Sequence, residues 1–132
     1  MATLDELKRE RRRKLEAVKK KGLDPYPAGS RRTHLIAQAA ADFNKLHKSN
    51  KKVYLVGRLR ALRDQGGLIF ADLQDESGAL QAVINKKHLK DFEFWREVLD
   101  IGDFIEVGGS LFKTKRGEKS IEVKSLKLLV KS

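Results

Sequence analysis

The pattern of the chain changes at about Lys52, and this change limits the folds that it can adopt. From this point on, short runs rich in β-branched and aliphatic residues alternate with turn-forming residues, which is typical of β-strands. A single segment of helical periodicity, Lys87–Asp100, interrupts them between the third and the fourth run. The predicted strands are Val53–Leu62, Leu68–Leu73, Leu80–Ile84, Phe104–Phe112 and Ser120–Val130.

Three strands, a helix and two further strands are the element order of the OB-fold. This fold is a five-stranded Greek-key barrel that often binds oligonucleotides on its second and third strands. We therefore expect a mainly β protein with helices, in which an OB-fold barrel over residues 51–132 follows a basic helical extension over residues 1–50. OB-folds also bind sugars and proteins, so the fold alone does not decide the function.

The first 50 residues contain two helical patterns. Residues 3–21 predict one helix with a narrow apolar stripe, which we expect to dock on another surface or chain. The stripe consists of Leu4, Leu7, Leu15 and Val18. Pro25 and Pro27 then favour an extended connector. Thr33 is expected to cap a second helix over His34–His47.

The charge of the chain is strongly positive and uneven. Lys and Arg number 29 against 18 Asp and Glu, for a net charge of +11. Residues 1–32 hold eleven basic and five acidic residues, and therefore six of these net charges. Such a field attracts polyanions through counterion release, so nucleic acid is the favoured class of partner. An anionic membrane is the competing partner, but the apolar stripe of the first helix lacks the Trp and Phe typical of membrane-surface helices.

Several other classes of protein are disfavoured. The sequence has no Cys, which excludes disulfides and thiolate metal sites, and His34, His47 and His88 lack a ligand-like spacing. No apolar run is long enough for a spanning helix or a signal-peptide core. No readable set of nucleophile, base and orienting residue is present, so we expect no catalytic residue. The expectation is a soluble cytoplasmic protein without a metal site.

Two polar or aromatic positions on the second and third predicted strands suggest a surface that reads bases. If alternate residues face the core, Phe70 and Gln81 point outward. A phenyl ring can stack on an unpaired base, and an amide can contact a base edge. The alternative is that Phe70 only packs under a loop or helix. Because both positions fall on the strands that bind ligands in OB-folds, we favour the base-reading interpretation.

Three charged residues could complete this surface. Arg63 has the alternation parity of the inward-facing Val53, so a bulge must intervene before its side chain can face a ligand. Glu118 and Glu122 share one face of the last strand with Ser120, and a carboxylate can accept a hydrogen bond from a base amino or imino group. For each residue, a solvated surface charge is the alternative reading.

Five segments, in order, resemble the N-terminal part of the bacterial-type lysyl-tRNA synthetases, which are class II enzymes. The first is similar to their Gly-x-x-Pro-Tyr-Pro connector, and the last to the hinge before their catalytic domain. The Pro-Tyr-Pro and Phe-Lys-Thr-Lys sequences favour the lysyl over the aspartyl enzymes. The segments are 21–27, 56–58, 70–78, 109–118 and 126–132.

This resemblance implies a function for the residues singled out above. In the family the OB domain binds the tRNA anticodon, whose middle base is U, so Phe70 would stack on that base while Arg63, Gln81 and Glu118 contact it. The carboxylate stays open, because the aspartyl enzymes take theirs from nearer Ser120 or Glu122. The basic helix would contact the tRNA backbone or another subunit. The candidates for backbone contacts are Lys8, Arg9, Arg12, Arg13, Lys19 and Lys20.

The resemblance also implies a catalytic domain after residue 132. The full-length enzyme would activate lysine with ATP and Mg²⁺, charge tRNA(Lys) and form a homodimer, whereas residues 1–132 would bind the anticodon stem-loop and need no cofactor. Two other functions remain open. One is a single-stranded nucleic-acid-binding protein that tolerates any sequence. The other is a module whose basic helix docks an acidic protein.

Overall fold

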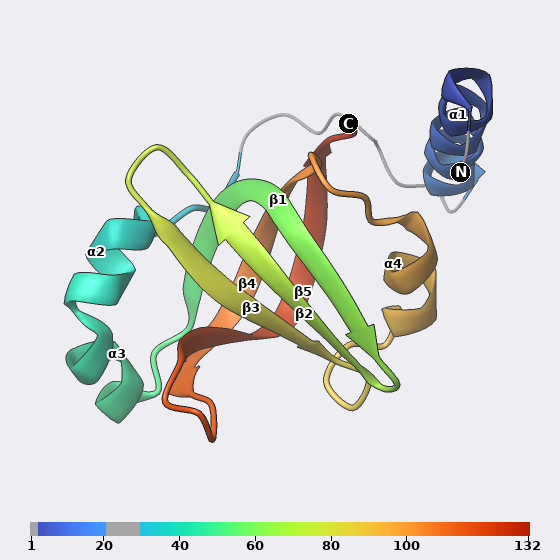
Figure 1. The fold of residues 1–132 in the computed structure, drawn as a ribbon. Coiled ribbons are helices and arrows are strands. Elements are labelled where there is room, and N and C mark those ends of the chain that lie inside the picture. The colour runs from blue at the N-terminus through green and yellow to red at the C-terminus, as the bar shows by residue number, and fades with distance from the viewer. Residues whose placement is uncertain (1–2, 21–29) are drawn as a thin grey trace.

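The computed structural model describes residues 3–20 and 30–132, and its five strands form a closed barrel (Figure 1). The order around the barrel is β1-β2-β3-β5-β4, and all neighbours are antiparallel except β3 and β5. The strands are β1 (Val53–Gln65), β2 (Leu68–Gln74), β3 (Ala79–Asn85), β4 (Phe104–Lys113) and β5 (Lys119–Val130). The helices are α1 (Leu4–Lys20), α2 (Ile36–Ala41), α3 (Phe43–Ser49) and α4 (Phe92–Val98).

The element order confirms the expected OB-fold architecture, with helices before a five-stranded barrel and one helix between its third and fourth strands. Each predicted strand is found, extended by one to three residues at one end or both. Two predicted helices differ from the structure. The helix expected over His34–His47 is two helices that meet at Asp42, and the helix expected over Lys87–Asp100 is confined to α4, because a turn at 86–91 precedes it. The Pro-Tyr-Pro connector lies outside the described residues.

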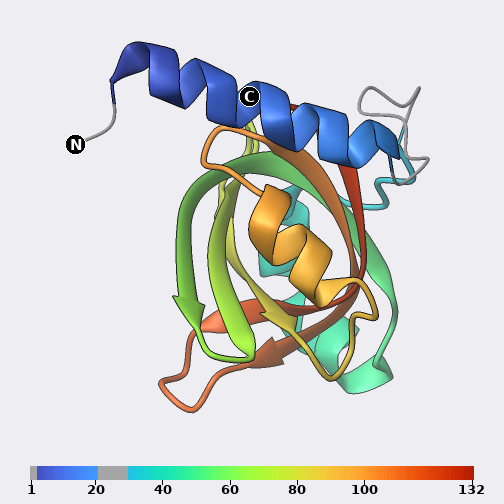
Figure 2. The same ribbon diagram turned by 90° about the vertical axis from the view of Figure 1, so that its right-hand side faces the viewer.

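Helices close both ends of the barrel. Buried side chains of α2 and α3 pack at one end, and those of α4 pack at the other, in one continuous hydrophobic core with the inward faces of the strands. Figure 2 shows α1 lying across the end that α4 covers. Arg13 of α1 donates to Glu97 of α4 at 3.0 Å.

The division of the chain into a helical extension and a barrel domain between residues 50 and 51 stays a prediction. Of the helices in the described ranges, none is long and apolar enough to cross a membrane.

The start of α2 is held by the turn between β2 and β3. Ile36 N–H donates to Asp75 Oδ2, and Ala37 N–H donates to Ser77 Oγ, each at 2.9 Å. The expected cap, Thr33, instead accepts a hydrogen bond from Tyr54 N–H of β1 at 3.0 Å. The prediction of a Thr33 cap is therefore wrong, because two side chains distant in sequence satisfy the first N–H groups of the helix.

Asp75 also closes its own turn, where Oδ1 accepts from the N–H groups of Ser77 and Gly78 at 2.7 and 3.0 Å. Burial alone would raise the pKa of the Asp75 carboxyl, but these hydrogen bonds, together with those from Ser77 Oγ and Ile36 N–H, hold the pKa below its ordinary value of 3.8. A lowered pKa contributes stability at pH values above about 3.8, and this contribution is lost as the pH falls through the lowered pKa.

Replacing Asp75 by Asn is therefore expected to lower the free energy of unfolding by about 1 kcal/mol at pH 7, since the amide can no longer accept all of these bonds. Urea unfolding at pH 7 and at pH 3 would measure this. The difference from the unmodified protein should shrink at pH 3. Asp72→Asn, at an exposed site on β2, is the control. Equal effects of the two substitutions would contradict the role of Asp75.

Candidate nucleic-acid interface

Four neighbouring strands place one row of side chains on the outer face of the barrel. Arg63 of β1 lies opposite Phe70 of β2, Phe70 lies opposite Val83 of β3, and Val83 lies opposite Glu122 of β5. Because paired residues in a sheet point to the same face, these side chains form one continuous surface. The structure therefore brings together residues separated by up to half of the chain.

Arg63 reaches this row because β1 contains an irregularity. The register between β1 and β2 shifts between Leu59 and Ala61. Before the shift Val53 and Leu59 are fully buried, and after it Leu62 packs on the core while Arg63 is exposed. The bulge that the alternation required for Arg63 is thus present.

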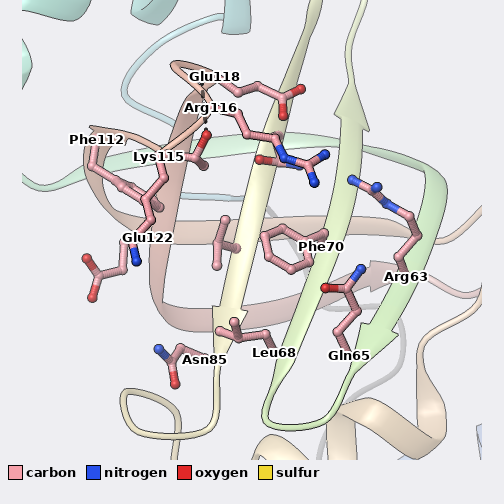
Figure 3. Close-up of a pocket in the computed structure, with 13 residues that line it drawn as sticks. Arg63, Gln65, Leu68, Phe70, Asn85, Phe112, Lys115, Arg116, Glu118 and Glu122 are labelled. Atoms are coloured by element: carbon pink, nitrogen blue, oxygen red, sulfur yellow. Dashed lines mark hydrogen bonds between the residues drawn. The ribbon is translucent and has the colours of Figure 1, made fainter.

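A pocket of about 500 Å³ lies over this row (Figure 3). Its size is within the range of small-molecule sites in proteins. Phe70 occupies the middle, with Arg63 on one side and two residues of the β4–β5 loop, Arg116 and Glu118, on the other. The pocket is lined by Arg63, Gln65, Leu68, Phe70, Gln81, Val83, Asn85, Phe112, Thr114, Lys115, Arg116, Glu118 and Glu122.

Phe70 is half-buried, between fully buried neighbours on the other face of β2. Its ring forms part of the pocket wall, and the guanidinium carbon of Arg63 lies 5.6 Å from the ring centroid. The outward orientation expected for Phe70 is confirmed, while its role stays a prediction. A ring in this position offers a π surface with a cation beside it, which suits a stacked base and the phosphate that follows it.

Gln81 faces the same pocket, but it is not exposed. Only 5% of the residue is accessible, because β5 covers one side of β3. Ser120 of β5 donates from Oγ to Gln81 Oε1 at 2.9 Å. The outward orientation expected for Gln81 is confirmed, but the residue is buried, because alternation along a strand gives the face of a side chain and not its depth.

The two candidate carboxylates have different surroundings. The Glu122 carboxylate is in contact with the imidazole of His88, with Oε1 2.7 Å from Nε2. The Glu118 carboxylate is exposed in the β4–β5 loop, and within the described residues it forms no side-chain hydrogen bond or ion pair. Its backbone is held, since Glu118 N–H donates to Thr114 Oγ1 at 3.1 Å and Thr114 N–H donates to Glu118 O at 3.0 Å. Glu118 is thus the carboxylate that is available to a ligand.

Sequence reasoning missed the basic residues of the β4–β5 loop. Lys115 and Arg116 are exposed and line the pocket, and Gly117 makes the turn between them and Glu118 with φ of 83°. The run Lys113-Thr114-Lys115-Arg116-Gly117 was a usable signal, because a basic turn between two strands is a suitable phosphate site. In OB-folds the loop between the fourth and fifth strands often contacts the ligand.

The basic candidates on α1 do not join this pocket. In both ribbon views α1 lies at the end of the barrel away from the β4–β5 loop (Figures 1 and 2). Lys8, Arg9 and Arg12 are exposed, whereas Arg13 forms ion pairs with Glu10 and Glu97. The hydrogen bond from Arg13 lowers the pKa of Glu10. The side chains of Lys19 and Lys20 lie outside the described residues.

No metal centre is found in the part of the chain that the structure describes, where no three His, Asp or Glu side chains gather closely enough to hold an ion. The residues that line the pocket offer stacking, hydrogen-bonding and charged groups to a ligand. This combination is typical of sites for unpaired nucleotides.

Comparison with known proteins decides the family. A model of the OB-fold nucleic acid binding domain of the tRNA anticodon type matches residues 53–129. The chain belongs to this family. The matched residues run from the start of β1 almost to the end of β5, so they include nearly the whole barrel and every residue that lines the pocket.

Similar proteins of known name extend the comparison to the N-terminal helices. The chain is 40% identical over 132 residues to a lysine–tRNA ligase of Roseiflexus sp. (strain RS-1), covering 98% of this chain and 27% of that protein. It is 41% identical over 122 residues to lysine–tRNA ligase 2 of Methanosarcina acetivorans, covering 90% of this chain and 24% of that protein. The chain thus spans about a quarter of the length of the curated relatives it matches.

Proposed function

We propose that this chain is the anticodon-binding domain of a lysine–tRNA ligase and that it reads the middle base of the anticodon in the pocket around Phe70. The observation that carries the proposal is the convergence of Arg63, Phe70, Gln81 and Glu118, from β1, β2, β3 and the β4–β5 loop, on this one pocket. The family match to an anticodon-type OB domain and the names of the relatives support it.

The chemistry of the pocket suits a uracil ring. Phe70 would stack on the face of the base, while the edge meets a carboxylate and an amide. Glu118 can accept a hydrogen bond from the N3–H of uracil, a position at which cytosine has a lone pair instead. Arg63 would also contact the base, whereas Lys115 and Arg116 would neutralise the neighbouring phosphates.

The remaining contacts follow from the electrostatics. The exposed Lys8, Arg9 and Arg12 of α1 are proposed to bind tRNA phosphates or another subunit, outside the pocket. The full-length protein is proposed to activate lysine with ATP and Mg²⁺, to charge tRNA(Lys), and to act as a cytoplasmic homodimer. Residues 1–132 would contribute recognition to that reaction and no catalytic group.

The first test is binding of this chain to a lysine-type anticodon stem-loop and to the same stem-loop with the middle U changed to C, each at two salt concentrations. We expect the change to weaken binding by roughly 1–3 kcal/mol, as for a single mismatched base in protein–DNA complexes. The difference should persist at both salt concentrations, because it comes from base contacts. Equal and strongly salt-dependent binding of both would favour a protein that holds phosphates without reading the base.

Replacing Glu118 by Gln is expected to weaken binding of the U-containing stem-loop roughly fivefold, because the new amide accepts a weaker hydrogen bond than the carboxylate. Glu122→Gln is the matched control, since Glu122 lines the same pocket but is paired with His88. Fluorescence anisotropy at constant salt would measure both affinities. A larger loss for Glu122→Gln would transfer the reading role to Glu122.

A further inference from the structure

Ser120 is a buried hydroxyl that connects two residues of the pocket without lining it. It has no accessible surface, and it lies directly opposite Gln81 in the register of β3 and β5. Its Oγ is 2.9 Å from Gln81 Oε1 and 3.3 Å from the carbonyl oxygen of Glu118. Ser120 is therefore in contact with the side-chain amide of Gln81 and with the backbone of Glu118.

A hydroxyl has only one proton to donate. The shorter contact, to Gln81 Oε1, has the ordinary length of a hydrogen bond between two oxygens, whereas 3.3 Å to Glu118 O is beyond that range. The proton is therefore assigned to Oε1. The consequence is that the oxygen of the Gln81 amide is used inside the sheet, and that its NH₂ group is left to face the pocket.

We propose that Ser120 is a positioning residue that makes Gln81 present only N–H donors to the base, so that the pocket selects a carbonyl over an amino group. The inference rests on the proposed function and assigns the means of its selectivity. Uracil has a carbonyl oxygen at C4, like thymine, whereas cytosine has an amino group there. An amide NH₂ group can donate a hydrogen bond to the carbonyl oxygen of uracil. At cytosine it would face an amino group, which is also a donor.

The burial of Gln81 strengthens the preference for a carbonyl over an amino group. Because Gln81 is 5% accessible, little water can reach the amide to satisfy an N–H group that a wrong base leaves unpaired. With the amide rotated by 180° about its last torsion, its oxygen would accept from the amino group of cytosine. In that orientation the NH₂ group would donate to Ser120 Oγ, and the hydroxyl proton would be left with the longer contact to Glu118 O, at 3.3 Å. Ser120 therefore disfavours the orientation that would make the site tolerant of both pyrimidines, and this preference is lost without its hydroxyl.

The test is Ser120→Ala in the whole chain, with the affinities for the U and C stem-loops measured side by side. We expect the ratio of the two affinities to fall at least threefold, chiefly because binding of C improves. The matched control is Ser110→Ala. Ser110 is 8% accessible on the neighbouring strand β4, and within the described residues its side chain forms no hydrogen bond. A purely structural role of Ser120 would weaken both stem-loops equally and leave the ratio unchanged.

A second variant tests the direction of the amide. In Gln81→Glu, Ser120 can still donate to one oxygen, and the other oxygen then faces the pocket as an acceptor, so the preference should shift from U toward C. If Gln81 already presented its oxygen, this variant would leave the preference unchanged. An unchanged ratio in both variants, with an unmodified protein that prefers U, would overturn the inference and leave the proposed function intact. No preference in the unmodified protein would overturn both.

Discussion

Replacing Lys131 by Met is expected to lower the free energy of unfolding by about 3–5 kcal/mol, the usual cost of removing one partner from a buried ion pair. The Lys131 side chain is 3% accessible. Its Nζ donates to Asp103 Oδ2 at 2.7 Å, to Asp100 Oδ2 at 2.9 Å and to the carbonyl oxygen of Val98 at 3.0 Å. Met has a similar length and no charge, so Asp103, which has no accessible surface, would lose its cation.

The ion pairs around Lys131 also connect α1 to the barrel. Asp100 also forms an ion pair with Lys14 of α1. Burial alone would raise the pKa of the Asp100 carboxyl, but the hydrogen bonds from Lys14 and Lys131 lower it below its ordinary value. Without Lys131 that pKa should rise, so the variant should lose less of its remaining stability on acidification, and its difference from the unmodified protein should shrink at low pH. Loss of Lys131 would therefore weaken the end of the barrel where α1, α4 and the last residues of β5 meet.

Urea unfolding at neutral pH would measure the effect of Lys131→Met. The control is Lys124→Met, an exposed position on β5, the strand that precedes Lys131, and Lys124 forms no ion pair within the described residues. The control should change the stability by less than about 0.5 kcal/mol. Equal, small effects at both positions would contradict this prediction. They would mean that the hydrogen bonds and ion pairs of Lys131 only offset the cost of removing its charge from water on folding. Neither Lys131 nor its partners line the pocket, so the folded fraction of Lys131→Met should bind RNA normally.

The strands and the pocket face were accessible from the sequence because both depend on local alternation. Ile69, Ala71 and Leu73 predicted the inward face of β2, and all are buried. The outward face then followed for Phe70. Arg63 could be placed only conditionally, since the sequence showed that a bulge was needed but not where it lies. The structure places that bulge at Leu59–Ala61.

The failures concern contacts between residues distant in sequence. The start of α2 is capped by Asp75, which lies 39 residues further along the chain, and no local pattern predicts such a cap. For Gln81 the sequence predicted the outward face but not the burial, because the burial depends on β5, a strand that pairs with β3 across a crossover. Ser120 was noted only for its face of the last strand. Its contact with Gln81 depends on the parallel register between the two strands.

Replacing Phe70 by Ala is expected to weaken binding of the anticodon stem-loop by about 1–3 kcal/mol, the usual effect of removing an aromatic ring on which a base stacks. The folded state should survive, because Phe70 is half-buried at the pocket wall and the fully buried core lies on the other face of β2. Anisotropy titration and thermal unfolding of the same preparation would measure affinity and stability together.

A second phenylalanine on the barrel provides a matched control for Phe70→Ala. Phe104 of β4 is also half-buried and lies under an arginine of β1, with the guanidinium carbon of Arg58 at 4.8 Å from its ring centroid, but it does not line the pocket. Phe104→Ala should therefore leave the affinity unchanged. Equal losses of affinity for the two variants would mean that aromatic rings on this barrel act through stability.

Phe70→Leu separates stacking from packing at the same position. Leucine keeps most of the apolar volume of the side chain but has no π face, so it should restore the melting temperature and only a small part of the affinity. Phe70→Tyr keeps the ring and should bind nearly as well as the unmodified chain. If Phe70→Leu binds as tightly as Phe70→Tyr, the ring only fills space beneath the ligand. Recognition of the base would then rest on the hydrogen bonds of Gln81 and Glu118 alone.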